Sequence, residues 1–285
     1  MATQAVRVSA APKRRIGPLL QYFVGGVVAA IVLIPLMAAV TNGFKSNAEL
    51  MMHPFGLPKT WQWDNYTSVL QSGAFWRQLL NSTMVMAATA IGVLVLASMP
   101  AFVFSRMTFR GRDLLFNFFT LGLLFPLAVA ILPLYITLRQ VQLVDSLWGI
   151  ILPQIAFGLP GSILILRGFF ATVPRELDEA AAIDGCSPAG FFVRVLLPLM
   201  RPALASVAVL TMVGSWNGFF LPLLVLNSEK LYTLPMGIMQ FQGQFGTDWG
   251  RVLAFVSLAL APTIIFYLFA ERQIVAGLTA GAVKG

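Results

Sequence analysis

The 285-residue sequence contains little charge, one cysteine and one histidine. Only 11% of its residues are charged, against about 25% in an ordinary soluble domain, and 58% are hydrophobic. This composition excludes a water-soluble globular protein. The single cysteine, Cys186, excludes an internal disulfide framework and a cysteine-rich metal site. His53 has no second imidazole or carboxylate pair beside it in the sequence, so we expect no metal site there.

Several stretches without charge are long enough to cross a lipid bilayer. A helix of about 20 apolar residues spans a hydrocarbon core of roughly 30 Å. The sequence therefore predicts an all-α membrane protein with six transmembrane helices, and prolines inside these stretches predict bent helices around an irregular cavity. The approximate spans are 18–42, 81–105, 114–138, 146–166, 202–226 and 252–270.

Basic residues orient the six predicted spans. Of the 19 Lys and Arg residues, thirteen fall on the side that holds both termini and six on the opposite side. The positive-inside rule then makes both termini cytoplasmic, with an N-terminal segment 1–16 and a tail 273–285 on either side of a membrane domain 17–272. This asymmetry also accounts for the net charge of +8, so we expect membrane lipid and not nucleic acid as a partner.

The chain lacks an energy source of its own. It has no phosphate-binding loop of the Gly-x-x-x-x-Gly-Lys-Ser/Thr type, which excludes an ATPase site. The predicted spans have no ionisable residue in their interiors, which disfavours an ion-coupled carrier. Ser162 and Ser215 have no activating base within the spans, so we do not expect an enzyme.

Neutral polar residues do occur inside the spans. Their commoner use in a membrane is hydrogen bonding between helices. The alternative is a path for a neutral, polyhydroxylated solute, for which an aromatic face and amide groups are suited. The candidate path residues are Gln154, Ser215, Trp216 and Asn217.

Two predicted outer segments are long. Residues 41–77 are rich in turn formers and aromatic residues, and form either amphipathic structure at the membrane interface or a plain connector with interfacial aromatics. Residues 227–251 form a polar loop with glycine hinges that is suited to contact an external protein. The candidate contact residues are Gln240, Gln242, Gln244, Thr247, Asp248 and Trp249.

The predicted cytoplasmic loop 171–200 is typical of two short helices with a bend. Pro174 suits an early helical position and the acidic residues after it suit the first turn, while Gly185 provides a stop and Ser187 a cap for the next helix. Leu177, Ala180 and Ala181 share one small, smooth face that a partner protein can approach closely. The alternative is a surface helix that rests on the membrane.

This loop resembles the EAA loop of the membrane subunits of binding-protein-dependent ABC importers. The similarity lies in Glu179-Ala180-Ala181, Gly185 and Val195-x-Leu197-Pro198. Further matches resemble the carbohydrate-uptake branch and its MalG-type permease: Ser215-Trp216-Asn217 and the segments 232–235, 245–249 and 277–285.

The resemblance implies a type I ABC importer permease of the MetI-like fold, in the cytoplasmic (inner) membrane of a bacterium or archaeon. A second MalF/MalG-like permease would complete the path for a sugar or oligosaccharide, delivered by an extracytoplasmic sugar-binding protein. Two cytoplasmic ATPase subunits would bind ATP and Mg²⁺, and this chain would bind no cofactor. The implied ATPase contacts are the coupling-helix residues Leu177, Glu179, Ala180, Ala181, Asp184 and Gly185, and the tail residues Leu278, Thr279, Gly281 and Lys284.

Two other functions stay open from the sequence. One is the same architecture carrying glycerol phosphate or another polyol, and the other is a stand-alone facilitator or channel. Gly218 follows the Trp216-Asn217 pair where members of the family often carry an acidic residue, so no role of that acid transfers to this chain.

Overall fold

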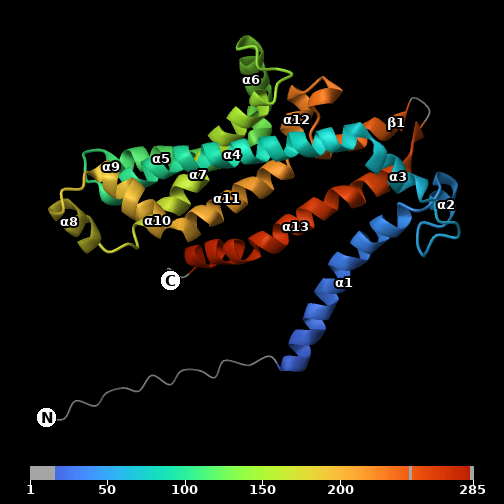
Figure 1. Ribbon diagram of the computed structural model, residues 1–285, viewed down its shortest axis with the longest axis horizontal. Helices are drawn as coiled ribbons and strands as arrows, with labels where there is room; N and C mark the ends of the chain where they lie inside the picture. The colour runs from blue at the N-terminus through green and yellow to red at the C-terminus, as the bar shows by residue number, and fades with distance from the viewer. Residues whose placement is uncertain (1–16, 244–245, 283–285) are drawn as a thin grey trace.

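A computed structural model of the protein describes residues 17–243 and 246–282, and most of them are helical (Figure 1). The α-helices are α1 (Pro18–Asn42), α2 (Asn47–Met52), α3 (Asp64–Gln71), α4 (Gly73–Arg106), α5 (Arg112–Leu121), α6 (Leu127–Gln140), α7 (Trp148–Phe170), α8 (Glu176–Ile183), α9 (Pro188–Phe191), α10 (Leu197–Leu199), α11 (Arg201–Trp216), α12 (Phe220–Val225) and α13 (Trp249–Ala282). The shorter elements are the 3-10 helices η1 (Gly122–Leu124), η3 (Glu229–Leu231) and η4 (Leu234–Phe241), the π-helix η2 (Phe192–Leu196), and the antiparallel strands β1 (Gln242–Gly243) and β2 (Gly246–Thr247).

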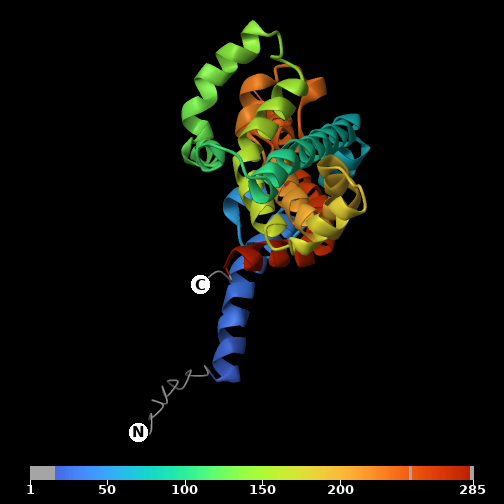
Figure 2. The ribbon, with the colours of Figure 1, turned by 90° about the vertical axis from the view of Figure 1, so that its left-hand side faces the viewer.

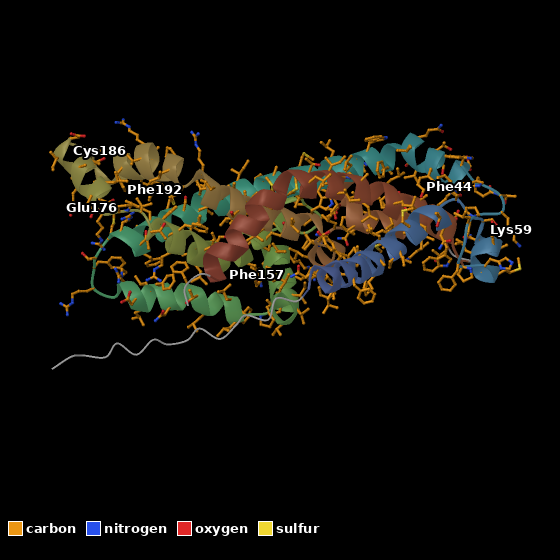
Figure 3. All side chains as sticks on the ribbon, turned by 90° about the horizontal axis from the view of Figure 1, so that it is seen from below. Phe44, Lys59, Phe157, Glu176, Cys186 and Phe192 are labelled. Atoms are coloured by element: carbon orange, nitrogen blue, oxygen red, sulfur yellow. The ribbon has the colours of Figure 1, made fainter. Side chains whose placement is uncertain are left out.

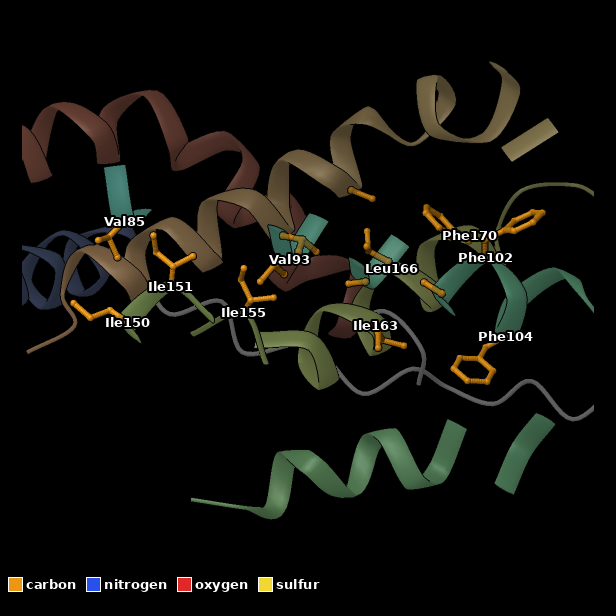
Figure 4. Packing of buried hydrophobic residues seen from close by; sticks show 14 of the residues in the cluster. Val85, Val93, Phe102, Phe104, Ile150, Ile151, Ile155, Ile163, Leu166 and Phe170 are labelled. Carbon is orange, nitrogen blue, oxygen red and sulfur yellow. The ribbon is translucent and has the colours of Figure 1, made fainter. Parts of the chain in front are cut away.

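Helices α4, α7, α11 and α13 lie side by side along the long axis and form the body of the molecule (Figures 1 and 2). Every fourth residue of α4 from Val93 to Ala101 is fully buried, and Val93 lies against Gly158 of α7. Small residues at this spacing let two helix backbones approach closely. Ile155, Ile163 and Leu166 of α7 pack into the same core (Figure 4).

The prediction of a helical membrane protein is confirmed. Helices α1, α4 and α7 are each long and apolar enough to cross a membrane, and the number rises to five if each of two bent helix pairs forms one span. Helix α13 adds a shorter apolar stretch, Trp249–Ile265. The count of six spans stays a prediction.

The stretch 114–138, predicted as one span, is broken. Helix α5 with η1 and helix α6 meet at an angle of 97°, and α6 stands out from the body (Figure 2). The break falls at Phe125 and Pro126, because a proline disfavours the α conformation of the residue before it and has no N–H to continue the ladder. Phe125 is accordingly extended, with φ −91° and ψ 106°.

The stretch 202–226 is also not one continuous helix. Helix α11 ends at Trp216 and α12 begins at Phe220. Asn217 caps α11 with its backbone N–H and side-chain amide both on the carbonyl oxygen of Val213. The chain therefore has a helix end inside a stretch that was predicted to be continuous.

The outer segment 41–77 is folded and contains α2 and α3. Phe44 stacks on Tyr66 with ring centroids 4.3 Å apart, and its ring also contacts Trp61 and Trp63. This aromatic cluster lies at the end of α1 that joins the body. Away from that end α1 is exposed from residue 20 to residue 35, and Figure 1 shows it diverging from the other helices.

Asp145, in the connection between α6 and α7, joins this connection to the segment that follows α12. Its backbone N–H donates to the carbonyl oxygen of Val225 at 2.8 Å. Its carboxylate accepts hydrogen bonds from the Ser228 hydroxyl and from the backbone N–H groups of Ser228 and Asn227. These bonds, led by that of the Ser228 hydroxyl, lower the pKa of Asp145.

We predict that Asp145→Asn lowers the free energy of unfolding by about 1 kcal/mol at neutral pH, because charge-assisted hydrogen bonds become neutral ones. A carboxylate with a lowered pKa stabilises the fold above its unfolded pKa of about 3.9, and this contribution disappears as the pH falls through the lower, folded pKa. Thermal unfolding in detergent should therefore show a deficit at neutral pH that closes in acid. Asp113→Asn is the control, since that side chain is 74% exposed, and an equal deficit there would contradict the prediction.

Candidate functional site

A cavity of about 490 Å³ opens in the body, where α4, α7 and α11 meet the ends of the two broken spans. Leu123 and Leu127 reach it from either side of the α5–α6 break, and Gly218 reaches it from the segment between α11 and α12. In membrane transport proteins, interrupted helices commonly form binding sites of this kind, because irregular backbone is tolerated where it lines a cavity.

A cluster of neutral polar side chains lies on the cavity wall. The side-chain oxygen Oε1 of Gln154 on α7 accepts a hydrogen bond from Ser215 Oγ on α11 at 2.7 Å and another from Thr89 Oγ1 on α4 at 3.1 Å. The three helices are thus joined at one amide. The sequence does not indicate Thr89 as a site residue, because a single threonine within a long apolar span is not distinctive.

Trp216 and Asn217 do not share this cavity. Consecutive helical residues point about 100° apart, so Trp216 faces away from the direction of Ser215. Trp216 Nε1 donates to Thr263 Oγ1 of α13 at 2.9 Å, and both Trp216 and Asn217 line a separate pocket of about 250 Å³ between α11, η4 and α13. Of the four candidate path residues, the structure brings only Gln154 and Ser215 together.

The predicted coupling loop lies at one end of the long axis. Figure 3 shows Glu176 and Cys186 at that end, and Phe44 and Lys59 at the other. Helix α8 begins at Glu176, so Pro174 precedes it and is not within its first turn. Gly185 follows the helix with φ +76°, and Ser187 caps α9 by accepting a hydrogen bond from the Gly190 N–H.

The predicted contact face of α8 is only partly free. Leu177 is 40% exposed and Ala180 is also exposed, whereas Ala181 packs against the hydrophobic core. Glu179, Asp184 and Gly185 are exposed at the same end of the molecule.

Arg106, at the last position of α4, holds α8 in place. Its Nη1 lies 2.9 Å from Asp178 Oδ2, and its Nη2 donates to the carbonyl oxygen of Val173 at 2.7 Å. The Arg106 side chain is only 5% exposed. In the sequence, Arg106 is only one of the basic residues that orient the spans, since nothing there shows that it meets a residue 72 positions later.

The predicted outer contact loop is partly exposed and ends at the start of α13. Gln240, Gln242 and Trp249 are exposed, while Thr247 and Asp248 are half-buried; Gln244 lies outside the described residues. Asp248 Oδ1 accepts a hydrogen bond from the Arg251 N–H, which caps α13.

The base of this loop is fastened to α4 by two residues that the sequence did not indicate. Asn81 Nδ2 donates to the carbonyl oxygens of Lys230 and Tyr232, both at 3.0 Å. Ser82 Oγ accepts from the Leu234 N–H at 2.8 Å. Both α4 side chains are buried.

The predicted tail contacts fall at the end of α13. Helix α13 continues to Ala282, so Leu278, Thr279 and Gly281 are helical, but their side chains lie outside the described part of the chain, as does Lys284.

Residues 93–274 match the family described as "Binding-protein-dependent transport system inner membrane component". A permease of a diacetylchitobiose uptake system, DasC of Streptomyces coelicolor, is 34% identical over 264 residues, which cover 91% of this chain and 96% of that protein. The permease SugB of a trehalose transport system from Mycobacterium tuberculosis is 36% identical over 231 residues, which cover 80% of this chain and 84% of that protein.

Among solved structures, a chain of a bacterial ABC transporter involved in the import of the acidic polysaccharide alginate has the same fold. Its TM-score is 0.78 at 22% identity, and the match covers 92% of this chain and 98% of that chain. The protein belongs to the family of inner membrane components of binding-protein-dependent transport systems, and it is a permease subunit of an ABC importer.

Proposed function

We propose that this permease imports an uncharged oligosaccharide. The observation that carries the proposal is the lining of the 490 Å³ cavity, where none of the described residues is ionisable and Thr89, Gln154 and Ser215 supply neutral polar groups. An ionic solute in such a site would lose its hydration without meeting a counter-charge, which is costly. The named solutes of the two relatives, diacetylchitobiose and trehalose, are neutral sugars and support the assignment.

The same reasoning argues against the phosphorylated polyol that the sequence left open. A phosphate group would call for Arg or Lys side chains near the path, and the cavity offers none among its lining residues. Membership in a binding-protein-dependent family argues against a stand-alone facilitator.

The proposal includes an assembly. Six spans with cytoplasmic N and C termini would pair with a second, similar permease in the cytoplasmic membrane. The exposed residues of α8 would contact one of two ATPase subunits, which bind ATP and Mg²⁺, and Leu278 to Lys284 would be a second contact. The exposed loop around Gln242 and Trp249 would meet the extracytoplasmic sugar-binding protein. The position of α8 and this loop at opposite ends of the long axis supports this arrangement (Figure 1).

Reconstitution into proteoliposomes tests the proposed function. The complete complex, with its partner permease, ATPase and binding protein, should accumulate radiolabelled trehalose or diacetylchitobiose when ATP is supplied, and should not accumulate glycerol 3-phosphate. A complex that accumulates only glycerol 3-phosphate would contradict the sugar assignment. Sugar flux through this chain alone, without an ATPase, would contradict the importer assignment.

A further inference from the structure

We propose that this chain itself recognises the solute, through the side-chain NH₂ group of Gln154, which donates a hydrogen bond to an oxygen of the sugar in the 490 Å³ cavity. The inference rests on the proposed function and assigns a specificity-determining residue to it. Three observations carry it: the orientation of the amide, the space in front of it and the apolar character of the surrounding wall.

The orientation of the Gln154 amide is fixed by its neighbours. Ser215 and Thr89 both donate to Oε1, so the oxygen is occupied and the NH₂ group is directed elsewhere. Within the described part of the chain Nε2 has no hydrogen-bond partner, although Gln154 lines the cavity. The two N–H donors of this amide therefore have no partner among the described residues and are available to a solute.

The space in front of the amide is kept open by Gly218. A β-carbon on Gly218 would lie 3.3 Å from Gln154 Nε2, tighter than an ordinary van der Waals contact, and 3.0 Å from the Ser215 carbonyl oxygen. Gly214, on the preceding turn, has nothing within 4 Å of the corresponding position. Both glycines line the cavity, so the donor faces open space.

The rest of the wall suits the apolar faces of a sugar ring. Phe157, Phe219 and Phe220 line the same cavity, whose volume lies within the range of about 300–1,000 Å³ typical of small-molecule sites. Figure 3 shows Phe157 between the two ends of the molecule. Such sites combine apolar walls with a few placed polar groups, which here are the Gln154 amide and the hydroxyls of Thr89, Ser162, Thr211 and Ser215. The ligand is therefore an uncharged molecule with acceptor oxygens, such as a hydroxyl, a ring oxygen or an acetamido carbonyl.

Gln154→Glu tests the donor with little change of shape. The carboxylate keeps an oxygen for the Ser215 and Thr89 hydroxyls and removes the two N–H donors, but it also adds a negative charge to the cavity. With the sugar that the wild-type complex imports, we expect the amount transported per ATP hydrolysed to fall about three- to tenfold, the range of one lost hydrogen bond. The ATPase rate stimulated by loaded binding protein should change less than about twofold. Gln154→Met, of similar size and without charge, should give the same result.

The matched control is Thr263→Val. It removes the hydrogen bond that Thr263 receives from Trp216, which also joins α11 to another helix but lies outside the cavity. Transport per ATP should stay at the wild-type value there. If the Gln154 variants do not assemble, Gly218→Ala, which places a methyl group against Nε2, should show the same loss.

The outcomes separate the two proposals. Unchanged transport per ATP in the assembled Gln154 variants, or in Gly218→Ala if those do not assemble, overturns the role of Gln154 and leaves the importer function in place. An equal loss in Thr263→Val also overturns it, because the effect would then follow from any lost bond between helices. A wild-type complex that imports no uncharged sugar overturns the proposed function, and this inference with it.

Discussion

Replacing Gly185 by tryptophan is expected to abolish ATP-dependent uptake while leaving the protein inserted in the membrane. Gly185 has φ +76°, a conformation that costs a residue with a side chain about 1–3 kcal/mol. The N–H groups of Gly185 and Cys186 donate to the carbonyl oxygens of Ala182 and Ala181, which ends α8 tightly. A strained or unwound turn would displace α8 from the position in which we propose that it meets the ATPase.

Tryptophan adds a steric effect at the same position. A β-carbon on Gly185 meets nothing within 4 Å, so the indole would project into the space where the partner is proposed to dock. The variant chain should therefore fold, and the indole should prevent the proposed contact between α8 and the ATPase. Assays in proteoliposomes measure uptake and ATPase activity. The amount of membrane-bound protein measures insertion.

Gly111→Trp is the matched control for Gly185→Trp. Gly111 has φ +86°, also has nothing within 4 Å of a β-carbon, and lies in another connection, immediately before α5. The backbone strain is thus comparable, but α8 is not touched. Uptake should persist in this variant at a clearly higher level than in Gly185→Trp. Normal uptake in Gly185→Trp would show that the loop is only a surface helix.

Replacing Arg106 by alanine is expected to loosen α8 and to reduce uptake about tenfold or more, since about 1.4 kcal/mol corresponds to a factor of ten. The change removes the ion pair with Asp178 and the bond to the Val173 carbonyl. Because Asp178 is 31% exposed, water partly replaces the lost partner, and we expect a local cost of about 2 kcal/mol, below the 3–5 kcal/mol of a fully buried pair. Hydrogen exchange of the α8 amides measures the loosening directly, and transport assays measure its effect on uptake.

Arg112→Ala is the control for Arg106→Ala. Arg112 pairs with the neighbouring Asp113, which is 74% exposed, and such surface pairs contribute at most about 1 kcal/mol. We expect unchanged exchange of the α8 amides in this variant. Equal protection of α8 in Arg106→Ala and wild type would show that Arg106 does not position the coupling helix.

The helical membrane fold could be predicted from the sequence because it depends on long apolar stretches. The breaks in the predicted spans could not be predicted, because proline ends a helix in some surroundings and is accommodated within a helix in others. Pro100 and Pro153 lie inside the continuous helices α4 and α7, whereas Pro126 separates η1 from α6. Neighbouring helices decide whether a proline only bends a helix or ends it. That information lies in packing, which a single sequence does not display.

The candidate site was predictable only in part, because contacts between residues far apart in the chain are not visible in a single sequence. Gln154 and Ser215 stand out as polar residues in apolar stretches, but their direct hydrogen bond joins residues 61 positions apart. Gly185 and Ser187 were predictable as a stop and a cap because those roles depend on adjacent backbone only. Arg106, Asn81 and Ser82 were missed because each acts on a distant segment of the chain.

Helix α4 carries attachment points at both of its ends. Asn81 and Ser82 fasten the outer loop near its start, and Arg106 fastens α8 at its last residue. Thirty-four residues make a rod of about 50 Å, so a tilt of about 5° around its centre would shift its two ends by about 2 Å in opposite directions. In the assembly that we propose, α4 would therefore connect the two faces of the membrane through one continuous segment of this subunit. A displacement at the end where α8 lies would then reach the outer loop through α4 alone.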